Sequence, residues 1–394
     1  MESSHYLGIH LDSNDKERKM KVVHIISALY QGGAESQLEK LIDYSSRNSG
    51  TEHVVISLKD DQTELMVRLR NKGISVYTLG MNRVFSFRSV INLIKLLNAI
   101  CTTNTIVQCW MYHANLLGFI ASTLSSTQPK VVWNIRRTQL PKGITGLVSN
   151  ICSFISNISP VSIVCCAQSA KESHILGKYS EKHMVVISNG IDTNLFVQSE
   201  AAREKFRSKL GIETHQKVIG MVARFELIKG HKNLLDAFHI LVSDRKLDDT
   251  FLVLVGRNIR GQSSICGYLN SDTIGRKIVL VEETQDIWNI YPGFDVLCMP
   301  SLSEGFPNVV AEAMSCGVGV VATDVGDAAN IISNPGNIVE PQNAVALADC
   351  LERYISKLNI SDHQISDDLR ASIQSRYSIE VAWKRYENLY KSIL

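Results

Sequence analysis

The chain has 394 residues, of which 45% are hydrophobic and 20% charged, and this composition excludes fibrous and wholly disordered classes. Its length exceeds what one ordinary hydrophobic core supports and predicts two domains. The 41 Lys and Arg nearly balance the 39 Asp and Glu, and a net charge of +2 lies far from the strongly basic balance of nucleic-acid binders. We therefore expect no nucleic-acid partner.

The N-terminal residues 1–19 contain no apolar segment of the signal-peptide kind, and Met20 directly precedes the first strand pattern. We expect these residues to form a disordered extension before the first domain. The nine Cys lie mostly in apolar runs and lack metal-type CxxC pairs, so they are expected to act as small hydrophobes in a reducing cytosol. The sequence thus favours a cytoplasmic protein.

Short β-branched runs alternate with amphipathic stretches of helix length from end to end, a pattern typical of parallel strands joined by crossover helices. The expected strands are 21–27, 53–58, 75–79, 106–110, 130–135, 162–167, 184–188, 217–224, 251–256, 277–281, 296–300 and 318–323. No stretch reaches the ~20 apolar residues of a spanning helix. The uncharged segment 143–170 is expected to form a buried helix followed by a strand. These patterns predict an α/β protein with two sheets.

The domain boundary is expected near residue 197, where a turn and a charged helix without any strand pattern follow the first group of strands. This gives a first domain at 20–197 and a second at 198–378. A polar stretch follows an apolar helix at 343–358. The last helix, 379–394, is expected to pack back on the first domain.

Residues 65–171 contain 11 Lys or Arg and no acidic residue. A positive field of this kind attracts a phosphorylated substrate or an anionic membrane surface, although chance and solubility would also explain it. Within this stretch, residues 81–100 combine basic and apolar residues in the way expected of an interfacial basic helix. That mixture comprises the basic residues Arg83, Arg88 and Lys95 and the apolar residues Phe85, Phe87, Ile91, Ile94 and Leu97. An ordinary helix with its apolar face in the core is the alternative.

The segment 299–327 reads as strand, loop, helix and strand, and in open parallel sheets ligands bind beyond the carboxyl ends of the strands. Glu304 lies in the loop, and Glu312 follows about two helical turns later, so both can face one cleft. Carboxylates accept hydrogen bonds from vicinal hydroxyls, which suits a ribose and a hexose. The alternative is that neither glutamate binds a ligand. In that case one only interacts favourably with the helix dipole, and the other is an ordinary surface residue.

The string SEGFPNVVAEAMSCG, with VVATDVGD after it, resembles the nucleotide-sugar site of retaining GT-B glycosyltransferases of the large group 1, or family 4, type. The segment GMVARFELIKGHKNLLDAF (220–238) is similar to the donor-diphosphate motif of that family, with Arg224 and Lys229 as its cationic pair. The resemblance implies donor contacts from the loop and the start of its helix. These residues are Gly305, Phe306, Pro307, Asn308 and Val309, with Glu304 on the sugar and Glu312 on the ribose.

Three further segments agree with the resemblance. SALYQGGAESQL (27–38) is similar to the family loop that closes over donor and acceptor, and places Gly33 near the donor. WMYHANLLG (110–118) resembles the strand end that carries the family histidine, here His113, near the reacting centre. VISNGID (186–192) resembles the turn before the interdomain linker. The resemblance therefore implies a catalytic set of His113, Arg224, Lys229 and Glu304.

Two segments depart from the family pattern. Where a Thr-x-His-like signature is usual, the chain has WNIRRT with Arg136 and Arg137, for which an acceptor phosphate and a structural difference are both possible reasons. After FLVLVG the chain continues RNIRG rather than Asp-Gly-Pro. Arg136 and Arg137 are accordingly the candidate acceptor-binding residues.

The prediction is a GT-B protein with two Rossmann-like domains facing a central cleft. We expect a metal-independent transferase without a cofactor, because no DxD ends a strand and cations can stabilise the leaving diphosphate. The family resemblance implies that the transferase retains the anomeric configuration. The expected donor is a UDP-linked hexose or N-acetylhexosamine. The expected acceptor is a glycan, lipid-linked at the inner membrane face, in bacterial surface polysaccharide synthesis.

Two alternatives belong to other classes. A catalytically inactive, GT-B-shaped partner protein would have lost donor binding. A dinucleotide-dependent oxidoreductase would need a GxGxxG after its first strand, which the chain lacks.

Overall fold

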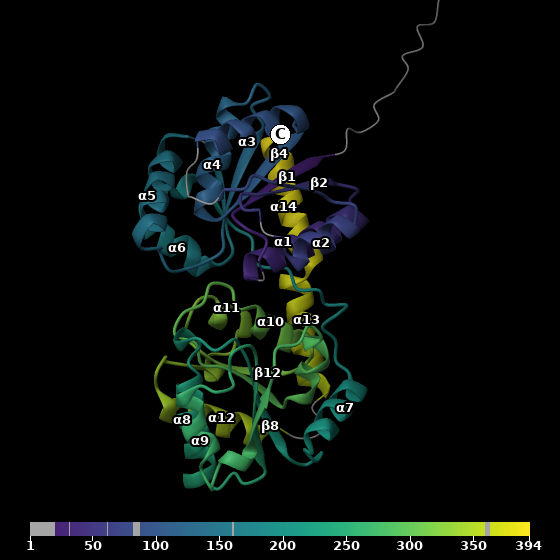
Figure 1. Ribbon diagram of the computed structural model, residues 1–394. Helices are drawn as coiled ribbons and strands as arrows, with labels where there is room; N and C mark the ends of the chain where they lie inside the picture. Colours follow the sequence, from purple (N-terminus) through teal and green to yellow (C-terminus); the bar gives the residue numbers. More distant parts are fainter. Residues whose placement is uncertain (1–19, 31, 61, 82–86, 160, 359–362) are drawn as a thin grey trace, which may run out of the picture.

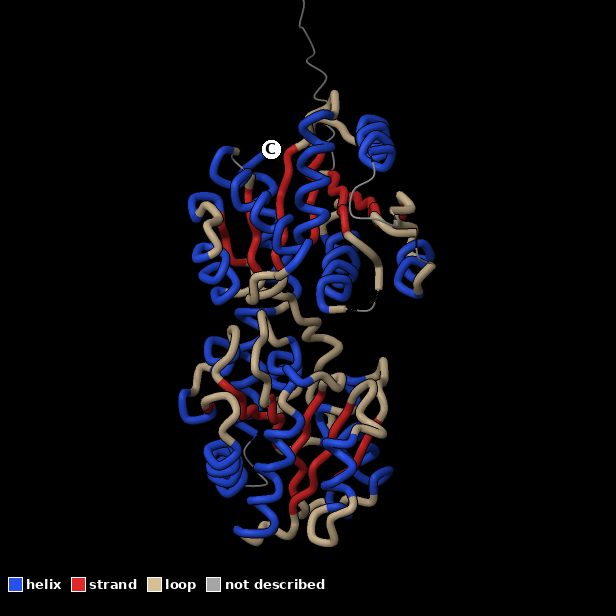
Figure 2. Tube along the Cα trace, turned by 60° about the vertical axis from the view of Figure 1, so that its left-hand side comes forward, coloured by secondary structure: helices blue, strands red, loops and turns tan. Residues whose placement is uncertain are grey.

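The computed structural model describes residues 20–30, 32–60, 62–81, 87–159, 161–358 and 363–394. They form two α/β domains, one built mainly from the first half of the chain and one from the second (Figure 1). Each domain has one parallel sheet with helices on both faces (Figure 2), which confirms the predicted pair of Rossmann-like domains. The described residues contain no helix that is long and apolar enough to cross a membrane.

The sheet of the first domain has seven parallel strands in the order β3-β2-β1-β4-β5-β6-β7. Its strands are β1 (Lys21–Ile26), β2 (Glu52–Ser57), β3 (Ser75–Thr78), β4 (Thr105–Trp110), β5 (Lys130–Ile135), β6 (Ser162–Cys165) and β7 (Met184–Val186). The central residue Val23 of β1 pairs with Val54 on one side and Val107 on the other. Strand order reverses between β1 and β4, which makes this position a topological switch point.

The helices of the first domain cover both faces of that sheet (Figure 2). They are α1 (Gly33–Asn48), α2 (Glu64–Asn71), α3 (Phe87–Ile100), α4 (Met111–Leu124), α5 (Gly143–Ile158), α6 (Gln168–Leu176) and the 3-10 turn η1 (Glu181–His183). Because helices cover both faces, the inner strands β1 and β4 are mostly apolar and almost wholly buried, as parallel sheets require.

The second sheet has six parallel strands in the order β10-β9-β8-β11-β12-β13. Its strands are β8 (Lys217–Val222), β9 (Thr250–Val255), β10 (Ile278–Val281), β11 (Val296–Met299), β12 (Gly319–Thr323) and β13 (Ile338–Val339). The chain reverses its strand order between β8 and β11, so the second domain has its own switch point. β13 is too short for its two residues to give a sequence pattern, and the sequence did not predict it.

The second half of the chain adds eight α-helices and several short turns to the described structure. The helices are α7 (Glu200–Leu210), α8 (His231–His239), α9 (Ser263–Leu269), α10 (Asn308–Ser315), α11 (Ala328–Ile332), α12 (Ala344–Lys357), α13 (His363–Tyr377) and α14 (Ile379–Ile393). The turns are η2 (Leu227–Lys229), η3 (Ile240–Asp244), η4 (Gly275–Lys277), η5 (Ile287–Asn289), η6 (Tyr291–Gly293) and η7 (Pro335–Asn337). α13 forms within the stretch that the sequence indicated only as polar.

The chain returns to the first domain at its C-terminal end. Ile191 and Ile379 join the two segments, because the Ile191 N–H donates to Tyr377 O and the Ile379 N–H donates to Ile191 O, each over 2.8 Å. Ser378 then caps α14 by accepting from the Val381 N–H. Buried Tyr386 of α14 packs with α1 and β1 and accepts a hydrogen bond from Asn134 of β5.

Two expectations about exposed and buried helices require correction. The segment 143–170 does form a helix and a strand, but α5 is not a buried helix, because one of its faces is apolar and exposed. Conversely, Leu93 and Leu97 of α3 are buried in the core, so the apolar face of this helix mainly packs inward. Arg83 and Phe85, which belonged to the expected interfacial helix, lie outside the described residues.

Candidate functional site

The candidate site is a cleft between the two domains, at the carboxyl ends of both sheets. The strands at both switch points end toward it, so β8 and β11 deliver one wall and loops of the first domain deliver the other. The cleft has a volume of about 660 Å³, within the range of small-molecule sites. From the first domain it is lined by Gly33, Arg136, Arg137, Thr138, Gln139, Cys166 and Asn189.

The second domain contributes the larger part of the lining. It comes from three stretches, which follow β8, end β11 and begin α10. The polar and glycine positions among them are Arg224, Glu226, Lys229, Ser301, Ser303, Glu304, Gly305 and Asn308. Phe306, Pro307 and Val309 complete the predicted donor loop on this wall.

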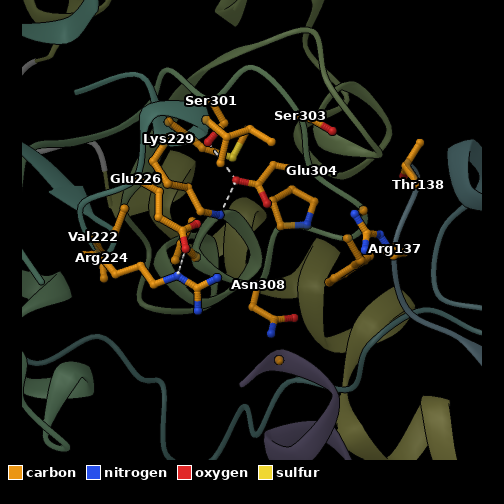
Figure 3. A pocket seen from close by; sticks show the side chains of 18 of the residues that line it. Arg137, Thr138, Val222, Arg224, Glu226, Lys229, Ser301, Ser303, Glu304 and Asn308 are labelled. Atoms are coloured by element: carbon orange, nitrogen blue, oxygen red, sulfur yellow. Dashed lines mark hydrogen bonds and ion pairs between the residues drawn. The ribbon is translucent and has the colours of Figure 1, made fainter. Parts of the chain in front are cut away.

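The second-domain side of the cleft contains the predicted donor loop, and we call it the donor wall. Two ion pairs lie on it (Figure 3). Lys229 Nζ lies 2.8 Å from Glu304 Oε1, and the Arg224 Nε atom lies 2.8 Å from Glu226 Oε1. Ser301 donates a second hydrogen bond to Glu304 Oε1 over 2.7 Å. The Lys229 and Glu304 side chains are only 24% and 14% exposed, so this pair is far less screened by water than the exposed Arg224 pair. Each predicted cation therefore already faces a carboxylate.

Backbone geometry at Gly230 holds Lys229 at the start of α8. Gly230 has φ +72, and a Cβ atom there would lie 2.0 Å from the Pro300 carbonyl oxygen. Only glycine lets the chain turn this closely against the end of β11. Lys229 lines the cleft directly before α8, and a cation beside the start of a helix suits an anion.

The predicted ribose ligand Glu312 does not line the cleft. It lies on α10 with a side chain only 12% exposed, where Lys40 of α1 donates to its Oε1 over 3.3 Å and Tyr291 donates to its Oε2 over 3.0 Å. A carboxylate accepts about four hydrogen bonds, so two acceptor positions remain. Burial and the adjacent Glu312 carboxylate raise the pKa of Tyr291, which keeps this phenol protonated as a donor.

The two arginines predicted to bind the acceptor lie differently in the cleft. The Arg136 guanidinium donates to Asn134, Tyr386 and Asn189 and lies over the Trp110 ring, 5.7 Å from its centroid. Arg137 is exposed and points into the cleft (Figure 3), and within the described part of the chain its guanidinium makes no hydrogen bond or ion pair. Arg136 therefore has a structural role. Of the two possible reasons for WNIRRT at this position, a structural difference is the one that applies to Arg136.

The remaining predicted residues of the first domain lie near its switch point. Gly33 begins α1 after β1 and lines the cleft. His113 lies in the first turn of α4 after β4 and is not among the lining residues. Burial lowers its pKa, and its Nε2 atom has no hydrogen-bond partner within the described residues. Met111, two residues earlier, has φ 70, a strained conformation of the kind that clusters at functional sites.

Three contacts hold the two walls together. The Asp327 carboxylate accepts from the N–H groups of Gln168 and Ser169 over 2.9 and 3.1 Å, so an acid of the second domain caps α6 of the first. Asn189 donates to Asn308 at the start of α10 over 2.6 Å. The third contact is the Lys40–Glu312 pair described above.

Several of these residues escaped the reasoning from sequence. Glu226, Ser301 and Thr138 line the cleft, and Lys40 and Asp327 join the domains. Asp327 lies in the VGD string that follows the donor motif, and this position is the one signal that could have identified it. Lys40 gives no signal because its partner Glu312 lies far away in sequence, whereas Glu226 and Ser301 lie within a few residues of their partners Arg224 and Glu304.

Comparisons with known proteins agree with this architecture. Among solved structures, the UDP complex of Anabaena Alr3699/HepE is 20% identical, with a TM-score of 0.79, over 95% of this chain and 100% of that one. A glycosyltransferase from Rickettsia africae ESF-5 is 21% identical, with a TM-score of 0.80, over 95% and 99% of the two chains. At these identities the likeness shows the fold, which is GT-B.

Sequence relatives extend the likeness to much of the chain. The capsular polysaccharide biosynthesis glycosyltransferase CapM of Staphylococcus aureus is 27% identical over 71% of this chain and 75% of its own. An Escherichia coli UDP-Gal:alpha-D-GlcNAc-diphosphoundecaprenol alpha-1,3-galactosyltransferase is 24% identical over 79% and 81%. Residues 202–368, which carry the donor wall, match the family described as "Glycosyl transferases group 1". This match, these relatives and the GT-B fold make the chain similar to the group 1 glycosyltransferases, most clearly in its second domain.

Proposed function

We propose that the protein transfers a hexose or N-acetylhexosamine from a UDP-linked donor to a lipid-linked glycan in bacterial surface polysaccharide synthesis. Solved neighbours of the same fold are complexes with UDP and with UDP-glucose. One relative is named for capsular polysaccharide biosynthesis and another for a diphosphoundecaprenol acceptor. These names support the donor and acceptor classes proposed for this chain.

The observation that carries the proposal is the arrangement of Arg224 and Lys229 beside the turn into α8, at the switch point of the second sheet. Two cations and the free N–H groups of a helix start can hold a diphosphate without a metal ion. The same groups stabilise the charge that develops on the diphosphate as the glycosidic bond breaks. When the donor enters, its phosphates compete with Glu226 and Glu304 for these cations.

The family resemblance supports retention of the anomeric configuration by attack on the face that the leaving diphosphate occupies. In this mechanism the acceptor oxygen bonds to the anomeric carbon while the bond from carbon to the diphosphate oxygen breaks. The leaving phosphate takes the acceptor proton. Glu304, held by Lys229 and Ser301, then positions the sugar and needs no role as a base.

The first domain offers Arg137 to an anionic group on the acceptor. This guanidinium points into the cleft opposite the donor wall (Figure 3). Its planar donors suit a phosphate oxygen pair, as in a lipid diphosphate. Arg136, whose donors are already engaged, instead fixes the loop that carries Arg137.

Calorimetric titration with UDP, GDP and ADP tests the donor assignment, and UDP is expected to bind most tightly. Transfer from the best UDP-sugar to a diphospholipid-linked acceptor, with NMR assignment of the new anomeric centre, then tests the reaction. An α-linked donor is expected to give an α-linked product. Absence of binding to any nucleotide would favour the inactive partner protein instead. The match of residues 202–368 to a glycosyltransferase family leaves the oxidoreductase alternative without support.

A further inference from the structure

Helix α5 presents an apolar stripe that no described residue covers. Its members are Ile144, Leu147, Ile151, Phe154 and Ile158, and their exposed fractions lie between 39% and 69%. The opposite face of the helix packs into the core through Val148 and Cys152, which are buried. Isolated exposed apolar residues are normal on a protein surface, but a continuous stripe of five marks an interaction surface.

The spacing places all five side chains on one face of the helix. Successive members are three, four, three and four residues apart, which at 3.6 residues per turn confines them to a sector of about 80°. The helix has 16 residues and no charged one, and it runs for about 24 Å. It is therefore long enough to lie along a surface but too short to span a bilayer.

The charges around α5 are positive. Lys142 precedes the helix and is exposed, and Lys178 lies beside its C-terminal half, where its carbonyl accepts a hydrogen bond from Asn157 over 2.9 Å. The nearest acids along the chain are Glu172 and Glu181, and both already have partners. Glu172 accepts from Gln168, and Glu181 pairs with Lys171. An apolar face with lysines at its edge complements an anionic lipid surface.

The stripe lies next to the acceptor side of the cleft. Arg137, Thr138 and Gln139 line the cleft, and the same loop then runs directly into α5 at Gly143. The five residues that follow Gln139, up to Ile144, reach at most ~18 Å, so the start of the stripe lies within that distance of the cleft wall. Leu140, in this connection, is 40% exposed and extends the apolar surface toward the cleft.

We propose that α5 docks the protein on an anionic membrane surface, with its apolar stripe in the lipid interface and the cleft opening beside it. A second copy of the chain is the rival occupant, because the spacing of the stripe also suits a coiled coil. A coiled coil needs three or four heptads with charged flanking positions, whereas α5 has about two heptads and no charge. Docking on the membrane does not depend on the sugar donor. It rests on the proposed function only in the claim that docking brings a lipid-linked acceptor to the cleft.

Co-sedimentation of the full chain with phosphatidylglycerol and phosphatidylcholine vesicles tests the proposal. The double variant Leu147→Ser, Phe154→Ser should bind anionic vesicles at least about tenfold more weakly than the unmodified protein, since two apolar side chains no longer enter the lipid. The matched control is Val67→Ser, Val345→Ser, which removes two similarly exposed apolar side chains from α2 and α12. It should bind as the unmodified protein does. Lys142→Ala, Lys178→Ala should weaken binding at low salt and have little effect at high salt.

The proposal is overturned if the unmodified protein ignores anionic vesicles at low salt, or if the stripe variant binds them as well as the control does. A dimer in light scattering that the stripe variant converts to a monomer, without vesicle binding, would assign the stripe to a second copy instead. UDP titration of the same proteins separates the two proposals. Vesicle binding without UDP binding would keep the docking surface and reject the transferase function, and the reverse result would do the opposite.

Discussion

The two domains share one architecture but differ in where they place polar side chains. The second domain concentrates charge at the cleft, in the Lys229–Glu304 and Arg224–Glu226 pairs. The first domain instead buries a series of hydrogen-bonded, neutral polar side chains within its core, among them His24 and His53. In the proposed function, a ligand replaces these internal ion pairs on the wall of the second domain. The first domain then serves as a rigid support with few charges of its own at the cleft.

The buried hydrogen-bonded side chains of the first domain allow one consistent set of hydrogen positions. The Trp110 indole can only donate, so His24 Nδ1 accepts and His24 Nε2–H donates to His53 Nδ1 over 3.0 Å. His53 Nε2–H then donates to Ser45, whose hydroxyl donates to Leu41 O. Both imidazoles are therefore neutral, and a proton added to either would leave two donors facing each other.

The largest expected effect concerns acid stability and distinguishes the two domains. Burial lowers the pKa of His53 to about 4 and that of His24 well below its usual value, while in the second domain burial lowers the pKa of His231 to about 4. Between about pH 6.5 and pH 4, these histidines therefore bind protons in the unfolded chain but not in the folded chain. This stability is fully present above about pH 6.5 and is lost as the pH falls toward 4.

By pH 4.5 the loss in free energy of unfolding should reach roughly 2–3 kcal/mol for His53 and for His231. Because His24 adds to the effect of His53 in the first domain, the amides of that domain should lose hydrogen-exchange protection first on acidification. Equal loss in both domains would contradict this comparison.

The next effect concerns the donor wall. Lys229→Ala should weaken UDP binding by ~1.5–3 kcal/mol in calorimetry, as expected for a charge-assisted bond. Lys232, three residues later and exposed in a pair with Asp236, is the matched control, and Lys232→Ala should have no effect. The double variant Lys229→Ala, Glu304→Gln removes the charge that the single change leaves unpaired. Unchanged UDP affinity in both Lys229 variants would show that the diphosphate lies elsewhere.

The two glutamates of the donor motif should separate sugar from nucleotide. Glu304→Ala should leave UDP affinity within about twofold but weaken a UDP-sugar about tenfold, since this carboxylate faces the cleft. Glu312→Ala should weaken both ligands about tenfold through the ribose. Lys40→Met should weaken both less, because Lys40 only orients Glu312. Identical losses for both ligands in both glutamate variants would remove the assignment.

The smallest expected effect distinguishes the two arginines of the acceptor wall. Arg136→Ala should lower the free energy of unfolding by ~1–2 kcal/mol, because it removes the hydrogen bonds that Arg136 donates to Asn134 and Tyr386. Arg137→Ala should leave stability unchanged and raise the KM for a diphosphate-linked acceptor several-fold. Denaturant titration and acceptor kinetics measure the two quantities. A KM effect from Arg136 alone would reverse the assignment.

The donor wall was readable in the sequence because each of its parts is a short motif of neighbouring residues. Glu304 through Val309 follow one strand directly, and the strand-to-helix pattern alone predicts that they lie at a sheet edge. The resemblance to a known family then supplied the roles. The acceptor wall combines loops after several strands, so which of its side chains are free could not be predicted from spacing. Arg136 and Arg137 are adjacent, yet only the fold shows that Tyr386, 250 residues later, engages the first.

Sequence by itself determined the α/β class, the twelve longer strands and the donor motif, because hydrophobic periodicity and local motifs are properties of neighbouring residues. Tertiary structure alone decided which apolar faces are covered. The stripes of α3 and α5 look alike in sequence, but Leu93 and Leu97 find a core to enter while Leu147 and Phe154 do not. It also decided that Glu312 faces Lys40 across the domain boundary. Burial and long-range pairing depend on what packs against a residue, and that partner is set by the fold of the whole chain.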